Sequence, residues 1–235
     1  MRILCVVPAR GGSKGVPRKN LRPVAGKPLL AWTVEQALAA QPAMDVVVST
    51  EDAEIAAVAL AHGADVPVLR PAELALDETP TEPVVRHALA VARESGPDPD
   101  AVVLLQATSP VRLPGSLTRA LEQFLTTGVD SLVGVVPQSP FTWTDGTEPS
   151  AAYDVTARPR RQDFAPEDLR YRETGSLYVT RPWVYDDLDN RIGGRVGLFV
   201  MDEVEGVDID TEHDLDVADA ILRRLLADAP AGRPT

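Results

Sequence analysis

The sequence predicts an α/β fold in which helices flank a mainly parallel β-sheet. Short apolar segments of strand length alternate along the chain with segments of helical periodicity, and this alternation is typical of βαβ units. The chain has 235 residues, and 44% of its residues are hydrophobic, which is enough for one full core. We therefore expect a single domain over residues 1–228, followed by a frayed tail over residues 229–235.

The expected elements follow one another from the first apolar segment onward. Apolar runs of strand length occur at residues 3–7, 46–48, 66–69, 102–105, 131–136, 177–179 and 196–201. Helical patterns begin at about residue 29 and occur at residues 53–61, 117–124 and 211–226. A further helix is expected after Thr79, with Pro80 at its first position and Glu82 completing a capping box with Thr79.

The regular alternation breaks down between residues 137 and 175. This stretch is rich in Pro, Arg, Asp and Thr, and we interpret it as an excursion from the sheet, because a strand pattern resumes by residue 177. Irregular segments longer than ~12–15 residues are uncommon as free loops in compact domains. The excursion carries aromatic side chains, which are enriched with arginine at protein interfaces: Phe141, Trp143, Tyr153, Phe164 and Tyr171. We therefore expect residues 137–180, which include the returning strand, to pack against another surface.

The loop after the first expected strand combines backbone freedom with positive charge. Residues 8–20, here called the basic loop, read Pro-Ala-Arg-Gly-Gly-Ser-Lys-Gly-Val-Pro-Arg-Lys-Asn. Glycines at positions 11, 12 and 15 allow turns in which successive backbone N–H groups converge on an anion. The spacing matches neither Gly-x-Gly-x-x-Gly nor the P-loop pattern. A solvated surface loop is the simpler interpretation, but ligands of open α/β sheets gather at the carboxyl ends of strands, so we favour a phosphate site.

The distribution of charge also indicates a small anionic ligand. The first thirty residues contain seven cations and no acid, whereas the whole chain has 35 acidic and 23 basic residues and a formal net charge of −12. This acidic balance argues against a nucleic-acid partner, which requires an extended basic surface, but allows a small nucleotide. The single cysteine, Cys5, lies in an apolar strand, and neither a signal peptide nor an apolar run of ~18 residues is visible. We therefore expect a cytoplasmic protein without membrane association.

Two aspartates precede the last expected helix. In an extended segment Asp208 and Asp210 would project to the same side, which suits a divalent cation. Mg²⁺ is often bound by one or two carboxylates together with phosphate oxygens and water. The alternative is that Asp210 or Thr211 caps the helix, with Thr211 and Asp214 forming a capping box. The residues alone leave both interpretations open.

Polar residues also follow the strand expected at residues 102–105. Gln106, Thr108, Ser109 and Arg112 come after its carboxyl end, where side chains can enter a pocket above the sheet. An ordinary turn at Ser109 and the proline after it is the alternative. The position of these residues nevertheless makes them candidates for a ligand pocket.

Six separated motifs run through the chain from about residue 3 to about residue 228. They are the basic loop, Val48–Asp52, Leu69–Ala75, Leu104–Arg112, Val207–Thr211, and Arg158–Phe164 together with Glu173–Tyr178. Together, in their order along the chain, they resemble the CMP-sugar synthetases that activate sialic-acid-like nonulosonic acids with CTP. The resemblance implies a Rossmann-like nucleotidyltransferase fold similar to that of GT-A enzymes. It also implies that the 2-hydroxyl of the acid attacks the α-phosphorus of CTP and that pyrophosphate is released.

The resemblance implies roles for individual residues. Residues that would bind the nucleotide are Ala9, Arg10, Gly11, Gly12, Ser13, Asn20, Arg70 and Thr79. Residues that would bind the acceptor acid are Gln106, Thr108, Ser109, Arg161, Thr174 and Tyr178. The implied catalytic set is Arg10, Lys14, Lys19 and Asp210, with Mg²⁺ bound by Asp208 and Asp210. Catalysis would then consist mainly of positioning and electrostatic stabilisation of phosphate charge.

The resemblance further implies a homodimer with two-fold symmetry, in which the excursion is a dimerisation arm. Arg158, Arg160 and Arg161 would lie near the acceptor site of the partner, and a flap over the pocket of the same subunit is the alternative. Thr174 replaces an asparagine, and Ala107 a proline, that are common in the family, so the identity of the acceptor stays open. The alternative acceptors are another keto-sugar acid and a phosphonate. The alternative reaction is that of a GT-A-like glycosyltransferase.

Overall fold

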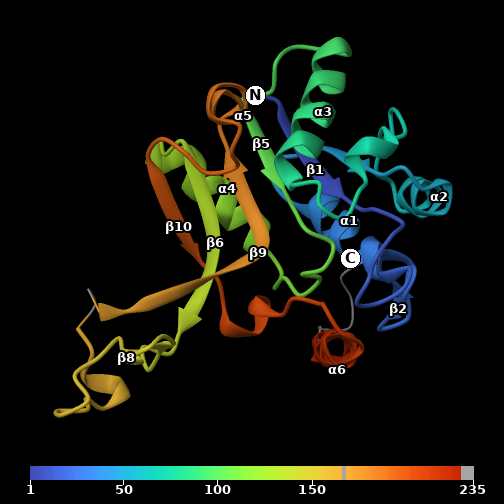
Figure 1. The fold of residues 1–235 in the computed structure, drawn as a ribbon. Coiled ribbons are helices and arrows are strands. Elements are labelled where there is room, and N and C mark those ends of the chain that lie inside the picture. Colours follow the sequence, from blue (N-terminus) through green and yellow to red (C-terminus); the bar gives the residue numbers. More distant parts are fainter. Residues whose placement is uncertain (166–167, 229–235) are drawn as a thin grey trace.

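One mixed sheet organises the fold. The structure, a computed structural model, describes residues 1–165 and 168–228, and the side chain of Arg161 lies outside this description. Within these residues six strands form one sheet in the order β10 (Val196–Val200), β6 (Ser131–Gln138), β9 (Arg170–Thr180), β5 (Ala101–Leu104), β1 (Ile3–Pro8) and β4 (Asp45–Ser49). Neighbouring strands are parallel except at β9, which is antiparallel to both β5 and β6. The predicted α/β class with a mainly parallel sheet is confirmed (Figure 1).

Helices cover both faces of this sheet. On one face α1 (Leu29–Ala39), α2 (Ala53–Ala61) and α4 (Ser116–Thr127) pack on the strands through one cluster of buried apolar side chains. On the other face α3 (Thr81–Glu94) and α5 (Pro182–Leu188) contribute to a second cluster. Strands buried on both faces read as continuous apolar runs, which is the pattern of β1 and β5. In the described part of the chain, no helix has the length and apolar character needed to cross a bilayer.

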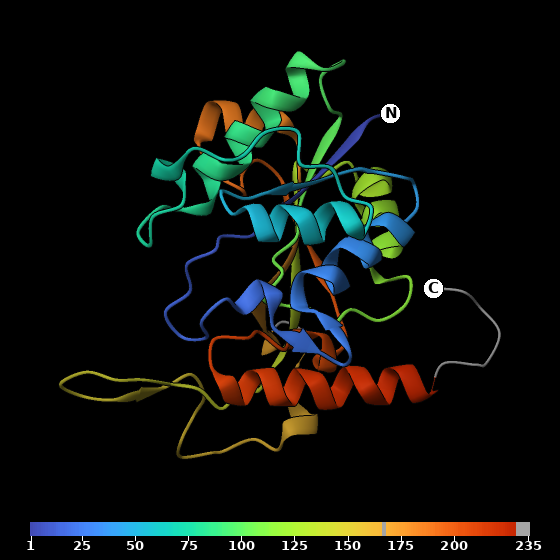
Figure 2. The same ribbon diagram turned by 90° about the vertical axis from the view of Figure 1, so that its right-hand side faces the viewer.

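The last helix lies outside these two layers. α6 (Glu212–Asp228) packs on the short strand β2 (Pro23–Val24) and on the start of α1 through a third apolar cluster that includes Trp32, Ile209 and Leu222. β2 pairs with β3 (Lys27–Pro28) just after the basic loop. Figure 2 shows α6 along the lower edge of the domain. This packing brings the segment before α6 close to the basic loop, although the two are nearly 190 residues apart.

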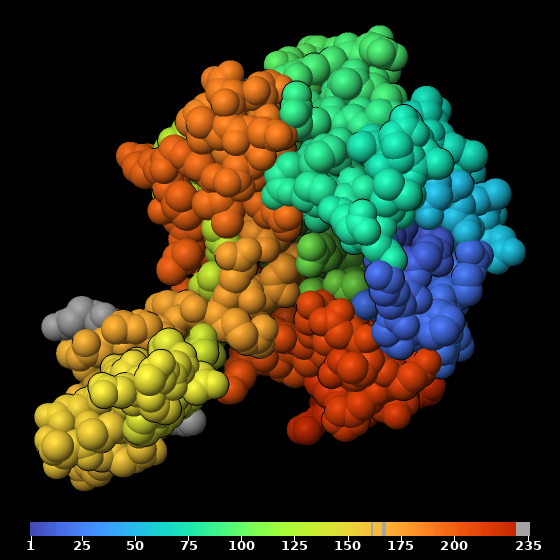
Figure 3. Space-filling view, in the orientation of Figure 1, coloured from blue at the N-terminus to red at the C-terminus, as the bar shows by residue number. Residues whose placement is uncertain are grey.

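Residues 137–175 form an arm that leaves the sheet between β6 and β9. After an irregularity between Val133 and Val135, these two strands stay paired as far as Gln138 and Arg170. Beyond that point lie the small hairpin β7 (Trp143–Thr144) and β8 (Ser150–Ala151) and an aromatic cluster. The ring of Phe141 contacts the rings of Tyr153 and Phe164 edge to face. Figures 1 and 3 show the arm projecting away from the body of the domain.

The strand expected at residues 66–69 is wrong. The only ladder contact nearby among the described residues is an isolated bridge between Asp65 and Val47, and the chain then bends at Val68 before it reaches Arg70. Pro67 has no N–H group with which to continue a ladder. The backbone N–H of Arg70 instead donates to the carbonyl of Thr50, which places this arginine beside the end of β4.

The capping box expected at the start of α3 is also wrong. The helix begins at Thr81 with Pro80 as its N-cap, and no side chain caps it. The Thr79 hydroxyl donates to the carbonyl of Glu73 at 3.2 Å, and Glu82 pairs with Arg191 at 2.6 Å. Because Pro80 occupies the cap position, Thr79 is one residue too far from the free helix amides. The helix α5 and the hairpin of β2 and β3 were not expected from the sequence.

Candidate active site

A cavity of about 360 Å³ lies at the carboxyl ends of β1 and β5. Its walls are the basic loop, the segment from Arg70 to Val84, the residues after β5 and the segment before α6. Figure 3 shows this hollow between the blue, teal and red parts of the surface, with the green residues after β5 at its floor. The residues predicted from the sequence that line it are Arg10, Gly12, Ser13, Lys19, Asn20, Arg70, Thr79, Gln106, Thr108, Asp208 and Asp210. The fold therefore brings together four segments that are far apart in the sequence.

Two cations of the basic loop pair with a carboxylate that the sequence analysis missed. Asp77 Oδ1 lies 2.6 Å from Arg10 Nη1, and Asp77 Oδ2 lies 2.8 Å from Lys14 Nζ. The hydrogen bond from Lys14, with a further one from Arg10, lowers the pKa of Asp77. Asp77 lines the cavity, so an acid lies among the groups that would attract phosphate.

Lys19 joins the basic loop to the segment that carries the two aspartates. Its side chain is 12% exposed, and Nζ lies 3.5 Å from Asp210 Oδ1 and donates to the carbonyl of Ile209. Gly15 lies against the same segment, because a Cβ at this position would overlap the carbonyl oxygen of Asp210. This close approach of two backbones explains the need for glycine at position 15.

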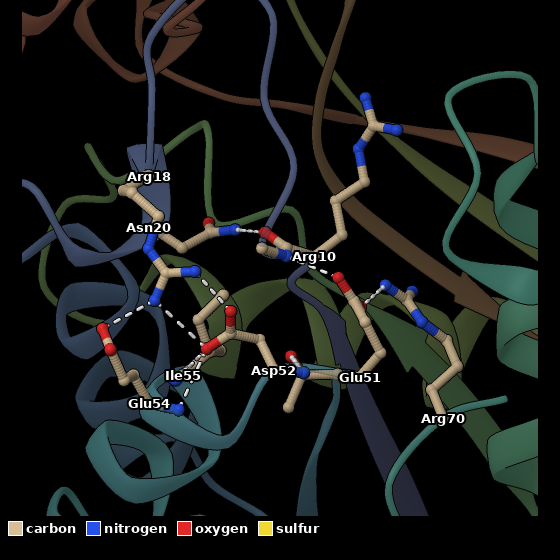
Figure 4. A network of polar contacts seen from close by, with 10 residues as sticks. Arg10, Arg18, Asn20, Glu51, Asp52, Glu54, Ile55 and Arg70 are labelled. Carbon is tan, nitrogen blue, oxygen red and sulfur yellow. Dashed lines mark hydrogen bonds and ion pairs between the residues drawn. The ribbon is translucent and has the colours of Figure 1, made fainter. Parts of the chain in front are cut away.

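Glu51 fixes two groups on one side of the cavity (Figure 4). Its Oε2 accepts a hydrogen bond from Arg70 Nη2 at 2.7 Å, and its Oε1 accepts one from the N–H of Gly11 at 2.7 Å. Burial raises the pKa of Glu51, but these hydrogen bonds outweigh burial and leave the pKa below its ordinary value. Arg70 is only 5% exposed, so Glu51 is the counter-charge of a buried guanidinium. Figure 4 shows the side chain of Arg10 extending away from this pair.

Arg18, another cation of the basic loop, is directed away from the cavity. It adopts a left-handed backbone conformation with φ of 56° and pairs with Asp52 and Glu54 at the start of α2. Its hydrogen bond lowers the pKa of Asp52, whose carboxylate also accepts the N–H groups of Glu54 and Ile55 as the N-cap of α2. Arg18 therefore anchors the loop, while Asn20 holds it from inside by donating to the carbonyl of Arg10 at 3.0 Å.

The segment before α6 contains both a helix cap and two further carboxylates. Asp214 accepts hydrogen bonds from the N–H groups of Asp210 and Thr211 at 3.1 and 2.8 Å, and its own N–H donates to the Thr211 hydroxyl at 3.2 Å. Thr211 and Asp214 therefore form the capping box, and the carboxylate of Asp210 takes no part in it. That carboxylate is 80% exposed and, with Asp208, lines the cavity.

The oxygen donors at this position fit Mg²⁺. Asp208 and Asp210 supply two carboxylates, and the hydroxyl of Ser109 lies 3.3 Å from Asp208 Oδ1. Among residues 1–165 and 168–228, no three His, Cys, Asp or Glu side chains are grouped in a way that could hold a metal. An ion here would complete its shell with phosphate oxygens and water, which is the usual coordination of Mg²⁺ in nucleotide enzymes.

Gln106 is supported from beneath by a buried cation. Arg112 is 4% exposed, and its Nη2 donates to the carbonyls of Gln106 at 3.1 Å and Ser176 at 2.8 Å. Burial lowers the pKa of Arg112 to about 10, so the guanidinium stays charged at neutral pH. Gly175 has φ of +71°, and a Cβ at this position would overlap Oε1 of Gln106. Gly175 therefore leaves room for the amide that lines the cavity.

The structure does not bring every predicted residue to the cavity wall. Of the predicted site residues that the structure describes, those that do not line the cavity are Ala9, Gly11, Lys14, Ser109, Thr174 and Tyr178. Thr174 is 3% exposed and its hydroxyl donates to the carbonyl of Gly134 at 3.1 Å, while the hydroxyl of buried Tyr178 donates to Glu173. The side chain of Arg161 lies outside the described residues.

Comparison with known proteins gives consistent relatives. The family model for cytidylyltransferases matches residues 4–154. N-acylneuraminate cytidylyltransferase A of Danio rerio is 35% identical over 224 residues, which cover 92% of this chain and 50% of that protein. CMP-N,N'-diacetyllegionaminic acid synthase of Legionella pneumophila is 35% identical over 224 residues, which cover 91% of this chain and 93% of that protein. A solved structure of CMP:2-keto-3-deoxy-manno-octonic acid synthetase with CTP superposes with a TM-score of 0.70 at 20% identity, covering 95% of this chain and 99% of that one.

The two curated relatives differ in length. The chain spans half the length of the Danio rerio protein but nearly all of the Legionella pneumophila protein. The solved structure, at its low identity, supports the fold alone.

Proposed function

Because the chain belongs to the cytidylyltransferase family, we propose that it transfers CMP from CTP to the 2-hydroxyl of a sialic-acid-like nonulosonic acid and releases pyrophosphate. The observation that carries this proposal is one cavity lined both by the cations Arg10 and Lys19 and by the carboxylates of Asp208 and Asp210. Cations can bind a triphosphate there, and carboxylates can bind its metal ion. The names of the curated relatives support the class of acceptor.

In this proposal the nucleotide binds between the basic loop and the segment that begins at Arg70. The nucleotide-binding set is Ala9, Arg10, Gly11, Gly12, Ser13, Asn20, Arg70 and Thr79. The hydrogen bonds of Glu51 to Arg70 and to the N–H of Gly11 support this arrangement, since they fix both sides of the site before the ligand arrives. Ala9 and Gly11 would act through the backbone of the loop.

Phosphate charge is stabilised by Arg10, Lys14 and Lys19. The charge of Lys19 is held in place by its contact with the carbonyl of Ile209, so it requires little reorganisation in the transition state. Asp208 and Asp210 would hold Mg²⁺, which when bound neutralises phosphate charge and lowers the pKa of a nearby hydroxyl.

The acceptor acid would lie against the floor of the cavity. Gln106 and Thr108 line this part, and the buried positive charge of Arg112 beneath them is favourable for an anionic acid. Thr174 and Tyr178 belong to the proposed acceptor set only as supports, because they lie behind the wall. Ser109 would act through Asp208.

We further propose that the protein is a cytoplasmic homodimer whose arms complete the acceptor sites, with Arg158, Arg160 and Arg161 near the site of the partner subunit. The arm extends away from the cavity of its own subunit, which argues against an intramolecular flap (Figure 3). Trp143 is 58% exposed on the arm, as expected for a surface that is covered on association. Sedimentation equilibrium should show a dimer at micromolar concentration, and a fully active monomer would contradict this part of the proposal.

Pyrophosphate release from CTP tests the function. The assay uses a panel of nonulosonic acids, another keto-sugar acid and a phosphonate, each with and without Mg²⁺. We expect release only with a nonulosonic acid and Mg²⁺. Release with another acceptor alone would change the substrate class, and consumption of a nucleotide sugar without pyrophosphate release would identify a glycosyltransferase.

A further inference from the structure

Asp77 occupies the cations that the proposed reaction requires for phosphate. Each of its two carboxylate oxygens contacts one cation, Arg10 at 2.6 Å and Lys14 at 2.8 Å. Neither cation makes another ion pair within the described residues. A triphosphate that enters the cavity therefore meets two of its partners already paired with one carboxylate, which offsets one of their two positive charges.

The segment that carries Asp77 is weakly attached to the rest of the domain. No residue of 71–79 is buried, and the backbone hydrogen bonds of this segment are local, from Leu74 to Pro71, from Ala75 to Ala72 and from Thr79 to Leu76. Among the described residues, the ion pairs of Asp77 are the only hydrogen bonds or salt bridges between residues 71–79 and any other part of the chain. Segments with so few buried contacts open at low free-energy cost.

We infer that Asp77 is a release-promoting residue that competes with the triphosphate and with pyrophosphate for Arg10 and Lys14. Binding of the nucleotide breaks both ion pairs and frees residues 71–79 from the basic loop. After CMP transfer, Asp77 pairs with the cations again and displaces pyrophosphate. This inference rests on the proposed function, because it requires the basic loop to bind phosphate.

The contacts of the basic loop indicate that Asp77 competes with phosphate and is not needed to hold the loop in place. The basic loop keeps its anchors without Asp77, since Arg18 pairs with Asp52 and Lys19 bonds to the carbonyl of Ile209. Asp77 places a negative charge at the cavity wall, where it would repel phosphate oxygens at close range. A carboxylate at this position lowers affinity for the leaving group and so favours turnover when product release is slow.

The test compares Asp77→Asn with the matched control Glu78→Gln. Glu78 is the exposed neighbour in the same segment, it makes no ion pair within the described part of the chain, and its substitution changes the net charge equally. Isothermal titration calorimetry measures the dissociation constants of CTP and of inorganic pyrophosphate with Mg²⁺ and without acceptor. Single-turnover and steady-state rates are measured on the same proteins.

For Asp77→Asn we expect roughly tenfold tighter binding of both ligands, which is the combined strength of two exposed ion pairs. Pyrophosphate should also become a stronger product inhibitor, and the steady-state rate should fall below the single-turnover rate. Hydrogen exchange at residues 71–79 of the free protein should be faster in Asp77→Asn than in wild type, and Glu78→Gln should match wild type in every measurement.

Three results would overturn the inference. Unchanged or weaker binding of pyrophosphate to Asp77→Asn, while wild type binds normally, would contradict competition and leave the proposed function intact. Equally tighter binding of pyrophosphate to Glu78→Gln would show that the effect comes from the change in net charge and not from the ion pairs of Asp77. Failure of wild type to bind either CTP or pyrophosphate would overturn both the inference and the proposed function.

Discussion

Asp210→Asn should abolish most turnover and leave the fold intact. The Asp210 carboxylate is 80% exposed, and its ion-pair partner is Lys19 at 3.5 Å. An exposed ion pair contributes at most about 1 kcal/mol, so the Tm of a chain of this length should fall by no more than about 4 °C. The substitution also removes one of the two carboxylates proposed for Mg²⁺. We expect kcat to fall about 100- to 1,000-fold, the usual cost of losing one preorganised charge-stabilising group, and the same for Asp208→Asn.

Asp214→Asn is the matched control for this prediction. It changes the same charge four residues along the chain, but the Asp214 carboxylate caps α6. The amide oxygen of Asn can still accept these hydrogen bonds, so this variant should lose only a little stability, from the missing negative charge at the helix N-terminus, and keep most of its activity. Pyrophosphate release at saturating CTP and Mg²⁺, with thermal unfolding of the same samples, separates the two patterns. Near-wild-type Mg²⁺-dependent turnover in the Asp208→Asn, Asp210→Asn double variant would refute the metal assignment.

Four further substitutions test other parts of the site. Arg10→Ala and Lys19→Ala should reduce kcat far more than they reduce Tm, because both charges act on phosphate; equal losses in activity and stability would indicate a structural role. Glu51→Gln should raise the KM for CTP and lower the free energy of unfolding by about 1–3 kcal/mol, since it leaves a buried guanidinium without its counter-charge. The folded-state pKa of Glu51 is lowered from 4.5, so this loss of stability should be complete above about pH 4.5 and vanish as pH falls through the lowered pKa; urea unfolding at several pH values checks the sign. Gly175→Ala should cost about 1–2 kcal/mol at its positive φ and raise the KM for the acid more than the KM for CTP, and equal changes in both KM values would argue against a role in placing the floor amide.

The residues that could be predicted from the sequence are those whose type and position indicate their chemistry. Glycines and cations after a strand predict an anion site wherever the strand lies in the sheet, and Asp208 and Asp210 are ambiguous only because a capping residue follows them. The spacing of Thr211 and Asp214 already offers a capping box as one alternative, and the backbone hydrogen bonds of the structure show that this box forms and leaves the carboxylate of Asp210 outside it.

The acids that pair with the cations of the site could not be predicted from the sequence, because these ion pairs depend on contacts between distant segments. The same holds for the segments that form the wall of the cavity. Asp77 and Glu51 are ordinary acids in the sequence, and they become site residues only when Arg10 and Arg70 fold against them. The apolar run at residues 66–69 has strand-like composition, but strand formation depends on a neighbouring strand, and only Asp65 forms a bridge there. A signal for Asp77 did exist, because it lies two residues beyond the Leu69–Ala75 motif.

A crystal structure with CTP and Mn²⁺ in place of Mg²⁺ would test the central claim most directly. The anomalous signal of manganese locates the ion independently of the phosphates. We predict a Mn²⁺ peak that contacts the carboxylates of Asp208 and Asp210 and an oxygen of the triphosphate, with the phosphates beside Arg10 and Lys19. CTP bound in this cavity with no ion at the two carboxylates, or CTP bound elsewhere on the protein, would contradict the account.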